Sequence, residues 1–428
     1  MSTLLSVNKL EAFRGHLSKT SLGFSKEVIE RAESFLCQTD FPTTKIEAWK
    51  YTRLNKISGI HASNDTALDT DVLSIYDLGK ETIEFVFQNG VLVSGYSEDG
   101  VECDLPDGLT ILPLEKCSPE QLQALPIQEN LDVFNTMNTL YCSSGLFIEV
   151  NKNTVVDKTI HIQHIVSGKN MVNHVKHFIH CGTSSNCNIV LTFISGDETE
   201  NCMSNVVTNV HVGENANLTI DKLQLEDEGN FGVFNEFTSI SANGNFTLNT
   251  ITLGGSLIRN NAHAEIKGQN AECNLNGAYL LKGSAHVDNH TLVEHQVPNC
   301  NSNELYKGVM DDKSTGVFNG KVIVHLDAQK TNAFQSNANV LLSKDATINS
   351  KPELEIYADD VKCSHGSTTG QLDENAVFYL RARGVSETSA RQLLVQAFIE
   401  DVLDKVEDQH VVTCIHKELS RRFNWSFN

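Results

Sequence analysis

The sequence has few of the features that membrane-spanning, exported or disulfide-stapled proteins need. No uninterrupted apolar run in its 428 residues approaches the ~20 residues that cross a bilayer. The start lacks the basic flank, apolar stretch and small-residue cleavage site of a secretory signal. Its 11 cysteines are odd in number and none are in CxxC spacing, which argues against a disulfide framework or a self-contained zinc or iron–sulfur motif. We therefore expect a cytoplasmic protein with free thiols.

Positive charge is also scarce. Lys and Arg total 33 against 54 Asp and Glu, which gives a formal net charge of −21. Such a chain repels phosphate backbones and anionic membrane surfaces, so neither nucleic acid nor a membrane is expected as its main partner. Hydrophobic residues make up 40% and charged residues 20%, values that fit an ordinary globular protein rather than a disordered one.

The common catalytic signatures are missing too. The sequence contains no nucleophile elbow, no dinucleotide-binding fingerprint and no GxxxxGK[ST] phosphate-binding loop. If nucleotide hydrolysis drives the work of this protein, a partner must supply it. We therefore expect a protein that is not itself an enzyme.

What the sequence does contain falls into three parts. Residues 1–130 combine helical patterns, including a helix that Ser25 could cap, with a hairpin signal at Asn89-Gly90 between two alternating apolar runs. Residues 131–385 carry short runs rich in Val, Ile, Leu, Thr and Phe, each bounded by Gly, Asn, Asp or Ser. Residues 386–428 read as helical again. We predict three domains with these boundaries.

The central part repeats a strand-and-turn unit with a loose period. No helical stretch separates its strands, which excludes alternating βαβ layers. A parallel β-helix fits, because stacked coils bury one continuous core, and because Asn and Gly suit the tight corners and can stack in ladders. An antiparallel sandwich or jelly roll would show similar strand content and stays open on the pattern alone. The predicted class is mainly β.

The C-terminal part predicts a helix capped by Ser386 with an unusually wide apolar stripe. Leu394, Phe398 and Val402 lie at helical spacing on that stripe. A small helical domain cannot cover such a face alone, so the body of the protein or a partner must do so. We predict these three residues as a partner-binding surface.

The histidines gather in two groups, one over 161–180 and one over 286–295. Residues three apart on a strand point to opposite faces, so the first group cannot form a metal site from one strand. We interpret both groups as core or surface histidines with weak metal potential across neighbouring coils.

Cys363 and His365 stand out near the end of the β region, before the turn-forming segment GSTTG. Because they are two residues apart, a strand would project both side chains to the same face. A thiolate and an imidazole together suit a soft metal or a cluster iron. We predict them as candidate ligands.

Three segments carry a resemblance to a known family. PTTKIEAWKYT (42–52), SNELYKGVMDDKSTGVFNGKVIVHLDAQKTNAFQSNANVLLS (302–343) and ADDVKCSHGSTTGQLDENAVFYLRARG (358–384) resemble the SufD family. That family provides a scaffold subunit of the SUF iron–sulfur cluster assembly machinery. The resemblance implies a right-handed parallel β-helix core flanked by N-terminal and C-terminal helical domains.

The same resemblance implies partners and a role. It implies a complex in which the chain pairs with SufB through the core and docks the SufC ATPase through its C-terminal helices, with a homodimer as the form of the isolated chain. His365 matches a histidine at the SufB interface, where a transient iron–sulfur cluster is thought to form, and Cys363 is its neighbour. The chain would not hold that cluster stably alone.

An enzyme remains the alternative hypothesis. β-Helix polysaccharide lyases and hydrolases share the predicted fold, but they need basic residues and calcium-binding carboxylates along a groove. Lys and Arg are sparse in the core of this sequence, and the export signal of a secreted enzyme is missing. The residues therefore favour a non-catalytic scaffold.

Overall fold

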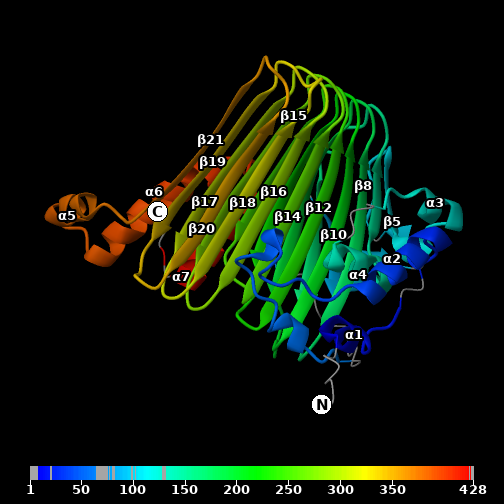
Figure 1. Cartoon of the computed structure of the whole chain (residues 1–428), viewed down its shortest axis with the longest axis horizontal. Coiled ribbons are helices and arrows are strands. Elements are labelled where there is room, and N and C mark those ends of the chain that lie inside the picture. Colours follow the sequence, from blue (N-terminus) through cyan, green and yellow to red (C-terminus); the bar gives the residue numbers. More distant parts are fainter. Residues whose placement is uncertain are drawn as a thin grey trace, which may run out of the picture.

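The body of the protein is a parallel β-solenoid of about eight turns (Figure 1). This computed structural model describes residues 8–19, 22–63, 76, 78–79, 82–97, 100–101, 103–127, 132–423 and 425. Successive strands alternate between two sheets, so that each turn of the solenoid adds one strand to each sheet. The prediction of a mainly β, parallel β-helix is confirmed. The antiparallel alternative is wrong, because the strands of the body pair in parallel and in register.

The ten-stranded sheet contains the odd-numbered strands of the solenoid, and the nine-stranded sheet contains the even-numbered ones. The first set is β7 (Thr159–Val166), β9 (Asn186–Ser195), β11 (Asn217–Leu225), β13 (Asn245–Thr252), β15 (Glu272–Leu281), β17 (Asn301–Met310), β19 (Asn332–Leu341) and β21 (Lys362–Gly370). The second set is β6 (Leu146–Val150), β8 (Val172–Cys181), β10 (Cys202–Val212), β12 (Asn230–Ile240), β14 (Leu257–Ile266), β16 (His286–His295), β18 (Thr315–Val324) and β20 (Thr347–Ile356).

Asparagine shapes the corners of the solenoid. Several corner residues adopt positive φ, which asparagine tolerates better than most side chains; these include Asn215, Asn243, Asn270 and Asn299. Amide side chains also bond from coil to coil, as between Asn245 and Asn217 at 2.7 Å. Such partners lie 27 to 31 residues apart, which is the length of one coil. The predicted asparagine corners and ladders are therefore present.

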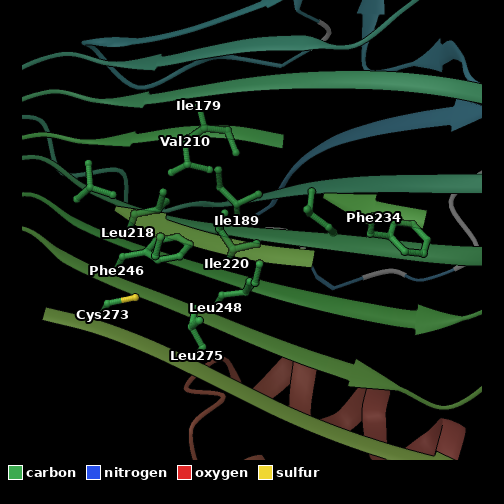
Figure 2. Packing of buried hydrophobic residues seen from close by; sticks show 14 of the residues in the cluster. Ile179, Ile189, Val210, Leu218, Ile220, Phe234, Phe246, Leu248, Cys273 and Leu275 are labelled. Carbon is green, nitrogen blue, oxygen red and sulfur yellow. The ribbon is translucent and has the colours of Figure 1, made fainter. Parts of the chain in front are cut away.

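The core lies between the two sheets. Inward side chains of β8 and β10, such as Ile179 and Val210, face those of β9, β11, β13 and β15 across the interior (Figure 2). Their strands carry apolar residues at alternate positions because successive side chains point to opposite faces. Burial of each large aliphatic side chain contributes roughly 1.5–3 kcal/mol, so the stack stabilises the solenoid along its length.

The N-terminal part covers the nine-stranded sheet with its helices and adds strands to both sheets. Its helices are α1 (Lys9–Arg14), α2 (Lys26–Gln38), η1 (Glu47–Trp49), η2 (Ile57–Gly59), η3 (Leu114–Lys116), α3 (Pro119–Ala124) and α4 (Val133–Tyr141), and its strands are β1 (Thr82–Gln88), β2 (Val91–Ser94), β3 (Tyr96–Ser97), β4 (Gly100–Val101) and β5 (Leu109–Pro113). Ser25 caps α2 as predicted. The hairpin at Asn89-Gly90 joins β1 to β2, both turn residues having positive φ.

Three strands of this part enter the solenoid sheets, β1 and β2 in the ten-stranded sheet and β5 in the nine-stranded sheet. β1 pairs in parallel with β7, and β5 pairs antiparallel with β6. The first domain boundary, at 130/131, lies in residues outside those described. The three-domain division stays a prediction.

The C-terminal part covers the ten-stranded sheet. It consists of α5 (Glu374–Ala382), α6 (Glu387–Leu403), whose N-cap is Ser386 as predicted, and α7 (Gln409–Phe423). Apolar residues of α6 and α7 pack against outward side chains of β9 to β17. Figure 1 shows α6 and α7 partly behind the solenoid and α5 extending beyond it at the left, away from the N-terminal helices. Within the described residues, each helix is too short or too polar to cross a membrane.

Candidate functional site at the open end of the solenoid

The solenoid ends in two strands that expose most of their length. β20 ends the nine-stranded sheet and β21 ends the ten-stranded sheet, so each pairs on one side only within its sheet. Along β20 the residues are half-buried or exposed, and along β21 all but Cys363 are exposed. An edge strand presents free N–H and C=O groups, and this end therefore offers a ready surface for another chain.

Cys363 and His365 both lie on β21. The expectation that GSTTG (366–370) forms a turn is wrong, because this segment continues β21 as a strand paired with β19. Cys363 and His365 stand opposite Ala333 and Gln335 of β19, which are buried inward residues of the preceding coil. Cys363 packs against the solenoid core, and His365 shares its face while remaining exposed. Burial raises the pKa of the Cys363 thiol. The predicted pair thus lies at the mouth of the solenoid interior.

A polar row continues inward from His365. Register places His365 opposite Gln335, and Gln335 opposite Glu304 of β17. The Gln335 amide donates to Glu304 over 3.2 Å, and the Thr291 hydroxyl donates to the same carboxylate. Complete burial raises the pKa of Glu304 to about 7. Sequence reasoning missed this row, although Glu304 and Gln335 lie in the segment that carries the family resemblance.

Beyond His365, a hydrogen bond joins the last strands of the two sheets at the open end. Ser350 of β20 and Ser367 of β21 share a hydrogen bond of 2.7 Å, and Ser350 also donates to Asn337 over 2.8 Å. Asn337 in turn accepts from Asn339 at 2.7 Å. Small hydroxyl and amide groups thus line part of the mouth, while Ile348 and Leu354 of β20 add partly buried aliphatic side chains.

Cys363 and His365 supply only part of the ligand set that a metal centre needs. His365 offers an accessible imidazole, whereas Cys363 must lose a proton before it can act as a ligand. Two protein ligands leave an iron or a cluster under-coordinated, since such centres take four or more ligands. Cys363 and His365 alone therefore do not make a complete metal site.

The predicted docking residues on α6 lie at different depths. Val402 is fully buried against the ten-stranded sheet, and Leu394 and Phe398 are half-buried. The ammonium group of Lys307 lies 5.0 Å from the centre of the Phe398 ring. The body of the protein thus covers much of the wide stripe. The exposed apolar side chains nearby are Leu393 and, on α5, Phe378 and Tyr379.

The first histidine group lies mostly in the interior. His161, His164, His174 and His177 are buried, and the Nε2 atoms of His164 and His177 are 3.2 Å apart. Burial lowers the pKa of His177 to about 3, and burial together with His177 lowers that of His164 well below its usual value. His164 and His177 are therefore neutral groups packed in the interior, and the four histidines are core residues, one of the two alternatives of the sequence interpretation.

The second histidine group, over 286–295, surrounds Asp288, which holds the N-terminal segment that contains Trp49 and Thr52. Asp288 bonds to Arg259 at 2.6 Å and to His290 at 3.0 Å, and Thr52 donates to the same carboxylate. The guanidinium of Arg259 lies 4.3 Å from the centre of the Trp49 ring. Burial alone would raise the pKa of Asp288. The charge of Arg259 and the bond to His290 nevertheless hold that pKa well below its usual range.

Comparison with known proteins gives a consistent assignment. Residues 164–398 match the family model described as SUF system FeS cluster assembly, SufBD core domain. The chain is 28% identical to the iron–sulfur cluster assembly protein SufD of Escherichia coli, over 87% of each chain. It is also 28% identical to a SufBD family protein of Synechocystis, over 88% of this chain and 86% of the relative. Protein ABCI7 of Arabidopsis chloroplasts shows the same identity over 88% and 81%.

The matched region runs from the first coils of the solenoid to α6 and includes the open end with Cys363 and His365. The polysaccharide lyase alternative gains no support from these matches. The chain belongs to the SufBD family of the SUF system of iron–sulfur cluster assembly.

Proposed function

We propose that this chain is a non-catalytic scaffold subunit of a cytoplasmic SUF complex. The observation that carries the proposal is the open end of the solenoid, where His365 and Cys363 form an incomplete ligand set on an exposed edge strand. In this proposal SufB packs against the open end, core to core. Its side chains complete the site on which a nascent iron–sulfur cluster, the cargo of the complex, assembles transiently.

The proposed second partner is the SufC ATPase, which docks on the C-terminal helices. Exposed Phe378, Tyr379 and Leu393, with the half-buried Leu394 and Phe398, form a candidate apolar surface on α5 and α6. Val402 supports that surface from beneath by holding α6 on the sheet. Because the sequence carries no phosphate-binding loop, ATP hydrolysis in the complex falls to SufC.

The decisive experiment replaces His365 by Ala in the SufB–SufC–SufD-type complex. We expect the complex to assemble normally, because one exposed side chain contributes little to a large interface. Cluster content, measured as iron and sulfide after anaerobic purification, should fall at least severalfold. The same variant should fail to complement a strain that lacks the chain.

Cys363→Ser is the matched control, since it changes the neighbouring residue on the same face. We expect a weaker effect there, because the pKa of Cys363 is raised and its side chain packs against the core. Full cluster content in the His365→Ala complex would leave the chain as a mechanical scaffold only. Loss of the complex itself would instead assign His365 a structural role.

A further inference from the structure

Two histidines and two glutamates gather on the outer face of the nine-stranded sheet, far from the open-end site in sequence and on the other sheet. Inward positions on β14 and β16 are taken by residues such as Ala264 and Val293, which are buried in the core. Their neighbours His263, Glu265 and Glu294 therefore point outward. His325 follows the end of β18, the next strand of the sheet, and completes the group.

The donor atoms of His263, Glu265 and Glu294 are close enough to share one ion, and His325 adjoins Glu294. His263 Nε2 lies 3.0 Å from Glu294 Oε1, and His325 Nε2 lies 3.1 Å from Glu294 Oε2. Donor atoms of His263, Glu265 and Glu294 all lie within 4.8 Å of one another. Around an octahedral ion with bonds of ~2.1 Å, adjacent ligands are separated by about 3 Å. A small side-chain adjustment would thus replace the hydrogen bonds by bonds to a metal.

The composition of the group selects the class of ion. Two imidazoles with one or two carboxylates suit a divalent first-row transition metal, such as Fe²⁺ or Zn²⁺, better than Ca²⁺ or Mg²⁺, which prefer all-oxygen sites. The carboxylates supply the compensating negative charge. Lys267, which bonds to Glu265 at 2.7 Å, competes with the metal for that carboxylate. Glu265 is therefore the weaker ligand of the four.

The surroundings both hold the ligands and admit an ion. His263 contacts the edge of the Phe237 ring, with 6.2 Å between centroids, which restricts its rotation. Its side chain and that of Glu294 are only 15% and 20% exposed. A hollow of about 520 Å³ opens beside them, lined in part by His263, Glu265 and Lys267. With a net charge of −21, the chain also attracts cations to its surface.

We propose that His263, Glu265 and Glu294, with His325 as an additional ligand beside Glu294, form a binding site for one divalent transition-metal ion on the outer face of the nine-stranded sheet. The site is independent of the proposed scaffold role at the open end. It belongs to this chain alone, since all four ligands come from two neighbouring strands, β14 and β16, and from the turn that follows β18.

The test measures metal binding by the purified full-length chain. Co²⁺ serves as a spectroscopic probe, and Zn²⁺ and anaerobic Fe²⁺ are titrated by calorimetry. Cys37 and Cys103, which are exposed thiols, are replaced by Ser in every sample to remove competing soft ligands. We expect one equivalent of Co²⁺ to bind with an absorption spectrum of nitrogen and oxygen ligands. His263→Ala and Glu294→Gln should each weaken binding about 100-fold or more, beyond the 10–100-fold that loss of an outer partner causes.

The matched control is His180→Ala. His180 lies on the same outer face with Nδ1 3.5 Å from Glu149 Oε1 and its ring stacked on that of His211, but it does not belong to the group whose donor atoms lie within 4.8 Å of one another. Binding should be unchanged in this variant. Glu294→Gln keeps the size and hydrogen bonding of the side chain, and thermal melting checks that each variant is folded. Absence of an equivalent bound by the parent, or equal affinity in folded His263→Ala and Glu294→Gln, would overturn the proposal.

Discussion

At the scale of single residues, the interior of the last coils is more polar than a β-solenoid requires. Glu304 illustrates this polarity, because its carboxylate is fully buried. Among the described residues, its hydrogen-bond partners are neutral groups, the Thr291 hydroxyl and the Gln335 amide. Burial without an opposite charge favours the protonated acid, which is why its pKa rises to about 7. This carboxyl therefore changes its charge near neutral pH while remaining inside the protein.

Glu304→Gln should remove part of the pH dependence of stability. The folded pKa lies above the ordinary value of about 4.5, so the contribution of Glu304 is fully present below pH ~4.5 and is lost as pH rises through about 7. We expect the variant to match the parent at pH 5 and to exceed its free energy of unfolding by a few kcal/mol at most at pH 8. Urea unfolding at the two pH values measures this, and equal differences at both would contradict the assignment.

At the scale of elements, the segment 42–52 fixes the N-terminal helices to the nine-stranded sheet, and we call it the clamp. Trp49 is buried between the ring of Phe134 and the guanidinium of Arg259, and Thr52 bonds to Asp288 on β16. The backbone carbonyl of Ala48 accepts a further bond of 2.8 Å from Arg259. The residues that carried the family resemblance at the N-terminus thus fix the helical part to the nine-stranded sheet.

Trp49→Ala should loosen this clamp. Removal of a buried indole leaves a cavity and uncovers the Arg259–Asp288 pair, so we expect a loss of about 3–5 kcal/mol. Thermal unfolding reports the loss, and faster proteolysis of the first 60 residues locates it. Tyr51→Ala is the control, because Tyr51 is 39% exposed in the same segment and its loss should cost little. Similar destabilisation by both changes would argue against a specific clamp.

The C-terminal helices make a separate prediction about docking. Phe378→Asp on α5 should abolish capture of SufC without lowering the melting temperature, because the side chain is 71% exposed. Val402→Ala on α6 should do the reverse, lowering stability through a buried cavity while leaving capture intact. A pull-down with SufC, read beside thermal melts, separates the two. Retention of SufC by Phe378→Asp would place the docking surface elsewhere.

The amino-acid pattern was sufficient to predict several turns and helix starts, but not which face of each element packs against the rest of the protein. Asn89-Gly90, Ser25 and Ser386 act locally, and each produced the predicted turn or cap. The side of α6 that meets the sheet depends on tertiary packing, so the burial of Val402 did not follow from its stripe. His263 and His325 each lie 31 residues from Glu294, one coil away. Their meeting becomes visible only when the register of the strands is known.

At the scale of the whole molecule, the two ends of the solenoid differ. The N-terminal end is extended by β1, β2 and β5, and Leu92 of β2 with Tyr96 and Leu105 beyond it pack against the core, whereas the other end stops at β20 and β21. Exposed Leu326, Ile356 and Tyr357 add apolar surface where β18 and β20 end. An uncovered pair of edge strands favours association with a like surface when no other partner is present.

The isolated chain should therefore form a homodimer through the open end. Sedimentation velocity over a range of concentrations should show a dimer that Ser367→Lys converts to a monomer, because an inward-directed charge on an edge strand opposes strand pairing. Thr183→Lys is the control, since it adds the same charge to an exposed turn of a middle coil. A parent chain that sediments as a monomer throughout would contradict this prediction.

The one-sided last coil also has a consequence for how the molecule opens. In a solenoid each coil is stabilised mainly by its two neighbours, and stability spreads by nearest-neighbour contact. The coil of β20 and β21 has one neighbour, so its local opening requires less free energy than opening of a middle coil. Any surface that covers it supplies the missing neighbour, and the free energy of that association appears as protection of the end against unfolding. Assembly and the completion of folding are, at this end, a single thermodynamic step.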